Sequence, residues 1–86
     1  MWITGQVIDD RGCALPGVTI EASAPGNKWS RAVVTNAQGT YVMPDLRPGP
    51  YTLTFARAGF ATLQRRIDRP PLFAATVNAK LTAGSV

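Results

Sequence analysis

The chain has 86 residues, so it is expected to form a single domain with one core, because domains usually contain about 100 to 150 residues. Apolar residues make up 45% of it, and Lys and Arg exceed Asp and Glu by nine to five, a net charge of +4. That composition is sufficient for a small domain to fold alone, and a charge this small does not by itself indicate nucleic-acid binding.

Several kinds of chemistry are excluded by the residues that are missing. The sequence contains no histidine, which removes the commonest general base and metal ligand and leaves no basis for zinc or Ser-His-Asp chemistry. Cys13 is the only cysteine, so an intramolecular disulfide cannot form. No apolar run approaches about 18 residues, and the first residues lack the pattern of an export signal. We therefore expect neither a membrane-spanning segment nor a signal peptide in this chain, and an exported parent protein would carry its signal upstream.

Strand-like runs alternate with turn residues along the whole chain, and apolar spacing typical of a helix does not persist anywhere. The predicted strands are Trp2 to Ile8, Gly17 to Ala24, Ser30 to Thr35, Thr40 to Met43, Tyr51 to Ala56, Phe60 to about Ile67, and Phe73 to Leu81.

Alternation within these runs predicts which side chains face a core. In the second run Val18, Ile20 and Ala22 share one face, and the run from Tyr51 to Ala56 has the strongest β-propensity, which predicts a central strand. In the last run the inward residues are predicted to be Phe73, Ala75, Val77, Ala79 and Leu81. Seven short antiparallel strands with one apolar face each predict two sheets packed face to face, an all-β sandwich.

The connections between the strands are also informative. Asp9 and Asp10 precede Gly12 and suit a tight turn; a calcium site would need about six oxygen ligands, and Arg11 stands where a further acid would be required. Leu46, among several prolines, is predicted to be an apolar plug. Cys13 lies in the first turn without a basic partner other than Arg11, so we interpret it as a turn thiol, with adventitious intermolecular oxidation as the alternative.

The turn residues occur in a characteristic order. The motifs are Gly5-x-Val7-x-Asp9-x-x-Gly12, Leu15-Pro16-Gly17-Val18-x-Ile20, Thr35-Asn36-x-x-Gly39-x-Tyr41, Leu46-x-Pro48-Gly49-x-Tyr51 and Gly59-Phe60. In this order and over about residues 3 to 81, the chain resembles the carboxypeptidase regulatory-like domain family. Each motif has a structural reason: the glycines suit turns that need a positive φ, and Tyr41 and Tyr51 fall on inward positions.

The resemblance carries expectations about fold and context. It implies a transthyretin-like fold, a seven-stranded antiparallel Greek-key β-sandwich, over residues 1–82, with residues 83–86 beginning a linker. Domains of this family are typically non-catalytic and are attached to peptidases, surface proteins or the N-terminal side of TonB-dependent outer-membrane receptors. The resemblance therefore implies a periplasmic or cell-envelope location, no cofactor, and other domains of the parent protein as partners.

Two tryptophans and a lysine are the candidate contact residues. Trp29 follows Lys28 in a polar loop, where an indole can stack on a sugar ring or anchor a protein contact; alternatively it folds back and caps one end of the sandwich. In the first predicted strand, Trp2 alternates in step with the residues that point away from the core. We expect it either to be a surface residue or to pack against a neighbouring domain.

A second candidate surface is basic. Arg65, Arg66 and Arg69, with Lys80 as a possible neighbour, can form a patch for phosphates or lipid headgroups. No series of aromatic residues accompanies them for base stacking, so we expect no nucleic-acid binding. The alternative is a solvated edge strand whose charges prevent edge-to-edge aggregation.

Three functional classes remain after this reading. The first is a spacer or protein-interaction module of an envelope protein, and the second is a carbohydrate-binding module that uses exposed aromatic residues. The third, an enzyme resembling transthyretin-like hydrolases, is disfavoured because their sites rest on histidines that this sequence lacks. Weak self-association through edge strands is compatible with each class, and direct membrane insertion of the domain is not expected.

Overall fold

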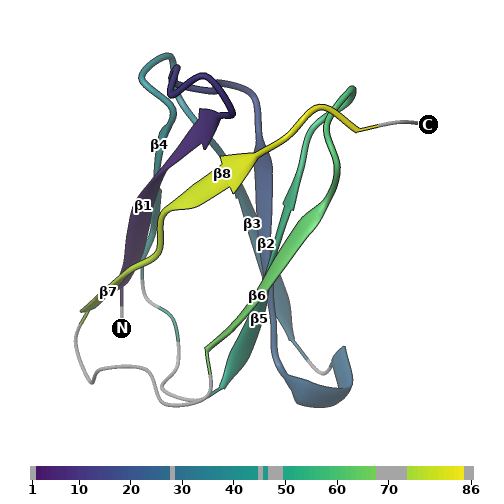
Figure 1. Cartoon of the computed structure of the whole chain (residues 1–86). Coiled ribbons are helices and arrows are strands. Elements are labelled where there is room, and N and C mark those ends of the chain that lie inside the picture. Colours follow the sequence, from purple (N-terminus) through teal and green to yellow (C-terminus); the bar gives the residue numbers. More distant parts are fainter. Residues whose placement is uncertain (1, 28, 45, 47–49, 68–73, 85–86) are drawn as a thin grey trace.

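The structure is a computed structural model in which residues 2–27, 29–44, 46, 50–67 and 74–84 are described. These residues form two sheets that face each other (Figure 1). The elements are β1 (Trp2–Asp9), β2 (Thr19–Ser23), the 3-10 turn η1 (Pro25–Asn27), β3 (Ser30–Val34), β4 (Thr40–Met43), β5 (Tyr51–Ala56), β6 (Leu63–Ile67), β7 (Ala74–Thr76) and β8 (Ala79–Leu81). The all-β sandwich predicted from the sequence is thus confirmed.

The two sheets differ in their strand directions. The second sheet has the order β3-β2-β5-β6 and is antiparallel throughout, so β5 is the central strand that its composition predicts. In the first sheet β1 pairs with β4 in the antiparallel sense, and its other edge pairs with β7 and β8 in the parallel sense. The prediction of seven antiparallel strands was wrong on two points: the described residues form eight strands, and two of the pairings are parallel.

The additional strand arises because the predicted run from Phe73 to Leu81 is interrupted. Phe73 lies outside the described residues, and the pairing with β1 breaks at Val77 and Asn78. There the Val77 amide donates to the Thr4 carbonyl at 2.8 Å, while the Asn78 side-chain oxygen accepts the Gln6 amide at 2.9 Å. At this point the Gln6 amide donates to the Asn78 side-chain oxygen and not to a backbone carbonyl. The ladder with β1 is therefore interrupted, and the predicted strand is divided into β7 and β8.

The space for this interruption comes from a glycine. A Cβ on Gly5 would lie 1.9 Å from the Val77 carbonyl oxygen, so that carbonyl occupies the volume in which a side chain of β1 would otherwise sit. The Tyr41 hydroxyl, on the strand that pairs with Gly5, donates a hydrogen bond to the same carbonyl. A glycine and a tyrosine together thus accommodate and satisfy a backbone group that points out of the ladder.

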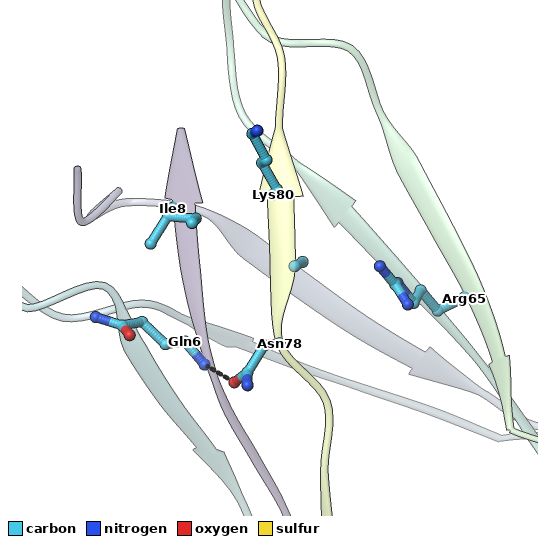
Figure 2. A pocket seen from close by; sticks show the side chains of 6 residues that line it. Gln6, Ile8, Arg65, Asn78 and Lys80 are labelled. Carbon is cyan, nitrogen blue, oxygen red and sulfur yellow. Dashed lines mark hydrogen bonds between the residues drawn. The ribbon is translucent and has the colours of Figure 1, made fainter. Parts of the chain in front are cut away.

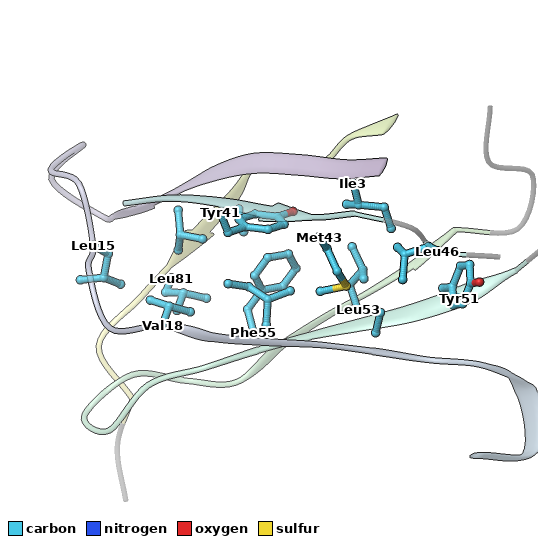
Figure 3. Close-up of a cluster of buried hydrophobic side chains, with 14 residues drawn as sticks. Ile3, Leu15, Val18, Tyr41, Met43, Leu46, Tyr51, Leu53, Phe55 and Leu81 are labelled. Atoms are coloured by element: carbon cyan, nitrogen blue, oxygen red, sulfur yellow. The ribbon is translucent and has the colours of Figure 1, made fainter. Parts of the chain in front are cut away.

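The core consists of apolar side chains from both sheets, several of which Figure 3 shows between the two layers. Burying each large apolar side chain contributes about 1.5–3 kcal/mol to folding. The predictions that Tyr41 and Tyr51 face inward and that Leu46 is an apolar plug are confirmed, because all three are buried. The buried residues are Ile3, Val7, Leu15, Val18, Ile20, Ala22, Tyr41, Met43, Leu46, Tyr51, Leu53, Phe55, Ala79 and Leu81.

Thr35 is a buried polar residue that joins two segments of the chain. Its hydroxyl donates to the Leu15 carbonyl at 2.7 Å and accepts the Val18 amide at 2.9 Å. Its own backbone amide donates to the Val18 carbonyl. Because each polar atom has a partner, the threonine fixes the entry to β2 without leaving an unsatisfied buried group.

Two loops at one end of the sandwich have the same hydrogen-bond pattern. Asp9 accepts, through its side chain, the amides two and four residues ahead, those of Arg11 and Cys13, each at 2.9 Å. Asn36 accepts the amides of Gln38 and Thr40 at 3.0 Å in the same way. Each loop has a positive-φ glycine at its fourth position, and the predicted turn at Asp9 is therefore confirmed.

The end of the described chain is held by backbone hydrogen bonds. The Ala61 amide donates to the Thr82 carbonyl at 2.9 Å, and the Gly84 amide donates to the Gly59 carbonyl at 3.1 Å. The hydrogen-bonded structure thus extends to Gly84, and the domain boundary predicted at residue 82 stays a prediction. The rest of the predicted linker, residues 85–86, lies outside the described residues.

Candidate interaction surface

Trp2 lies on the outer face of the first sheet, as its alternation with buried Ile3 predicts. Its side chain is 50% exposed. Val42 of β4, 48% exposed, lies on the same face, because Val42 pairs with Thr4, the next outward residue of β1. We call Trp2, Thr4 and Val42 the Trp2 face. An exposed indole beside an exposed valine is typical of a surface that contacts another protein.

Trp29, in contrast, is partly buried and packs against the core. Its ring centroid lies 5.4 Å from that of Tyr51, and the Arg31 guanidinium carbon lies 5.5 Å from the centre of the indole. Arg31 is itself held by a hydrogen bond of 2.5 Å to the Pro44 carbonyl. These contacts favour the capping alternative for Trp29, and a ligand contact at this residue stays a prediction. Lys28 lies outside the described residues.

The arginines of the predicted basic patch are divided between two surfaces. Arg65 pairs with buried Leu53, so it lies on the inner face of the second sheet, at its β6 edge. Arg66 pairs with Thr52 and lies on the outer face, because neighbouring residues of a strand point to opposite sides. Arg69 lies outside the described residues. Arg65 and Arg66 therefore lie on opposite faces of the second sheet, and their function as a patch with Arg69 stays a prediction.

Arg65 instead shares a hollow with Lys80. The hollow has a volume of about 290 Å³ and lies around β8, as Figure 2 shows. In that view Gln6 and Ile8 lie on the β1 side of β8, Lys80 extends from β8 itself, and Arg65 lies on the opposite side. The residues that line it are Gln6, Ile8, Arg65, Asn78, Ala79 and Lys80, none of them acidic. The predicted proximity of Lys80 to an arginine is thus realised with Arg65 from the facing sheet.

Tyr41 is the group whose acidity the fold changes most clearly. Burial raises the pKa of its phenol to about 12, and the positive charge of Arg65 opposes part of that rise. Because the neutral phenol is favoured, its hydrogen remains available for the Val77 carbonyl at any pH well below that value.

Asp9 is the last residue of β1, and Cys13 belongs to the loop that follows it. Asp9 organises its own loop through two backbone amides, and among the residues that the structure describes no three His, Cys, Asp or Glu side chains group as a metal site would require. Cys13 is exposed in the same loop, and its amide is one of the two that Asp9 accepts.

Sequence reasoning missed two features of this surface. Val42 alternates with buried Tyr41 and Met43, so its outward position and its apolar character were both available from the pattern. The sequence named Lys80 as a possible neighbour of the arginines but gave no signal for the hollow itself, because Arg65 and Lys80 come from strands in different sheets and line it together only in the folded chain.

The family assignment rests on a comparison of nearly the whole chain. The family model of the carboxypeptidase regulatory-like domain matches residues 2–82. The chain belongs to the carboxypeptidase regulatory-like domain family. A curated relative of this domain is the "TonB-dependent transporter Oar" of Myxococcus xanthus, which is 37% identical over 73 residues. That alignment covers 78% of this chain and only 7% of the transporter, so the domain corresponds to a small part of its relative.

Solved structures support the fold of the regulatory-like domain at low sequence identity. The Bacillus anthracis TIE protein superimposes with a TM-score of 0.77 at 17% identity, over 95% of this chain and 16% of that one. Catechol 1,2-dioxygenase from Pseudomonas arvilla C-1 gives 0.75 at 14% identity, over 100% and 53%. A type II cohesin-X-dockerin complex from Acetivibrio cellulolyticus gives 0.69 at 19% identity, over 98% and 58%. Such diverse proteins share the sandwich alone, since fold does not imply function.

No helix among the described residues is both long and apolar enough to cross a bilayer.

Proposed function

We propose that this regulatory-like domain is a non-catalytic accessory module of a larger cell-envelope protein related to TonB-dependent transporters, in which it acts as a spacer and protein-interaction domain. The family and the 37% identity to such a transporter support this context. The alignment covers only 7% of that relative, so most of the transporter consists of other segments. By analogy, we infer that the binding partners of this domain are other domains of its own parent protein. The same relationship supports an outer-membrane parent, with this domain on the aqueous periplasmic side.

The observation that carries the interaction role is the exposure of Trp2. A tryptophan at 50% exposure beside a valine at 48% leaves apolar area in water that a docked domain would cover. Tryptophan is also enriched among the residues that dominate binding energies at interfaces. We infer that the Trp2 face docks against a neighbouring domain of the parent protein.

The test uses Trp2 as its own reporter. Trp29→Phe leaves Trp2 as the only tryptophan, and its fluorescence is measured in this chain alone and in the longer parent protein. Docking is expected to shift the emission to shorter wavelength and to reduce quenching by acrylamide, because the indole leaves water. Trp2→Phe with Trp29 retained is the matched control, and its emission is expected to change little, since Trp29 already packs against Tyr51.

The opposite result would remove the proposal. If Trp2 in the parent protein emits at the same wavelength and is quenched as in the isolated chain, the Trp2 face is not a docking surface there. A change in Trp2 emission on addition of an oligosaccharide to the isolated chain would instead favour the carbohydrate-binding class.

A further inference from the structure

One side of the sandwich presents two strand edges without partners among the described residues. β8 pairs with β1 alone and β6 pairs with β5 alone. Figure 1 shows β6 and β8 on the near side of the molecule, with β3 and β4 behind them. The bridge between Phe60 and Ala83 closes one end of this side. An edge strand of this kind offers backbone donors and acceptors to an incoming chain.

The β8 edge is also positively charged. Arg65 and Lys80 both line the hollow around β8, and among the described residues neither forms an ion pair or a side-chain hydrogen bond. No carboxylate lines the hollow. Two cations that share a hollow repel each other, and an anionic group placed there would relieve that repulsion.

Asn78 adds a hydrogen-bond donor in a fixed orientation. Its side-chain oxygen accepts the Gln6 amide at 2.9 Å, which fixes the orientation of the side-chain amide. That nitrogen has two hydrogens to donate. Arg65 and Lys80 have only donors, and Asn78 adds a further donor to the lining of the hollow, so the three favour an acceptor such as a carboxylate.

The charge also decides which chain can occupy this edge. A second copy would bring its own edge strands, whose charged residues are Arg65, Arg66 and Lys80, and like charges on adjacent strands are destabilising. A self-association through this side is thereby disfavoured. An extended segment with carboxylates is favoured instead, because its backbone can hydrogen-bond to the strand edge and its negative charges attract Arg65 and Lys80.

We propose that the free edge of β8 binds an extended acidic peptide, which adds to the sheet as a strand. Lys80 lies on the outer face of the sheet, and Arg65 approaches from the inner side. Since side chains of a strand alternate between faces, two adjacent acidic residues of the peptide place one carboxylate on each cation. The binding determinant is therefore a consecutive acidic pair within a segment of β-propensity. This site is separate from the Trp2 face and does not depend on it.

The probe is a fluorescently labelled nine-residue peptide with Thr and Val flanks and a central Glu-Glu pair, titrated with the full 86-residue chain by fluorescence anisotropy. Three matched peptides separate the contributions: Gln-Gln in place of Glu-Glu, the two Glu residues moved to alternate positions, and N-methylation of alternate backbone amides. We expect each change to weaken binding, because they remove the charge, its distribution over two faces, and the strand hydrogen bonds respectively.

Variants of the chain locate the site. Arg65→Gln and Lys80→Gln are each expected to weaken binding of the Glu-Glu peptide about 1.5- to fivefold, the range for exposed charge pairs. Arg11→Gln makes the same charge change at an exposed residue of the Asp9 loop and is expected to leave binding unchanged. Amide NMR signals of β8 and β6 should shift on titration, while those of the Asp9 loop should not.

Several outcomes would overturn the proposal. Equal affinity for the Glu-Glu and Gln-Gln peptides, or equal loss in Arg11→Gln and Lys80→Gln, would show that the hollow is not the site. Displacement of the peptide by inorganic phosphate, together with full affinity of the N-methylated peptide, would assign the hollow to a simple anion in place of a strand. These results do not depend on the Trp2 emission experiment. Failure of the peptide-binding proposal would therefore not contradict docking through the Trp2 face, and the reverse also holds.

Discussion

The phenolic oxygen of Tyr41 lies 2.5 Å from the backbone carbonyl oxygen of Val77, to which its hydroxyl donates a hydrogen bond across Gly5. The two residues are 36 positions apart in the chain. Tyr41 belongs to β4 and Val77 to the connection between β7 and β8, so the bond spans the whole width of the first sheet over β1. It satisfies a carbonyl that the β1 ladder leaves without a partner at the interruption.

Tyr41→Phe removes this hydroxyl and keeps the ring that packs against Phe55. We expect the free energy of unfolding to fall by about 1–2 kcal/mol, because the Val77 carbonyl loses its partner in a partly buried setting. Urea denaturation measures the change. Trp2→Phe, at an exposed aromatic residue, is the control and should shift stability by less than about 0.5 kcal/mol. Unchanged stability of Tyr41→Phe would mean that water replaces the hydroxyl.

The raised pKa of Tyr41 predicts a loss of stability at high pH. The phenol titrates near 10 in the unfolded chain and at about 12 in the folded chain, so the folded state holds its proton more tightly. The stabilisation is complete below pH 10 and is lost as the pH rises from 10 towards 12, by up to about 3 kcal/mol. The measurement is the difference in unfolding free energy between the natural chain and Tyr41→Phe from pH 8 to 12. A difference that stays constant over this range would contradict it.

Gly5→Ala tests whether the missing side chain is required. The added Cβ would lie 1.9 Å from the Val77 oxygen and 2.9 Å from the Tyr41 ring, so the connection between β7 and β8 must move. We expect a loss of about 3 kcal/mol in the free energy of unfolding. Gly12→Ala is the matched control: its Cβ meets nothing within 4 Å, and its positive φ alone costs about 1–2 kcal/mol. Equal effects of the two substitutions would rule out the steric explanation.

Asp9→Ala tests the role of the carboxylate in the first loop. Because Asp9 accepts the Arg11 and Cys13 amides, its removal is expected to lower the free energy of unfolding by about 1 kcal/mol, whereas Asp9→Asn keeps an acceptor and should cost less. Thermal denaturation of the three proteins with and without millimolar calcium chloride provides the measurement. A calcium-dependent rise in melting temperature that Asp9→Ala abolishes would restore the metal interpretation.

Much of the fold was predictable because burial imposes a period of two on a strand. The inward positions of Val18, Ile20 and Ala22 and the central place of β5 followed from alternation and β-propensity. The turn at Asp9 followed from short polar side chains ahead of a glycine. These features depend on residues close together in the sequence, so a local pattern contains the necessary information.

The candidate surface was predictable only in part, for the same reason. The outward parity of Trp2 was visible in the sequence, whereas the contacts of Trp29 with Tyr51 and Arg31 depend on how a loop folds back over the core. Adjacency in the sequence predicts one patch for Arg65 and Arg66, whereas neighbouring residues of a strand point to opposite faces of the sheet.

By itself the sequence determined the set of core-facing side chains, the positions of the turns and the family. Tertiary structure alone decided that the last predicted strand breaks at Val77, because alternation continues unchanged through the break and its cause lies in distant Gly5 and Tyr41. It also decided that Arg65, and not its neighbour Arg66, lines a hollow together with Lys80. The physical reason is that a strand pattern specifies a face, while the partners across a sheet edge depend on how the two sheets are stacked.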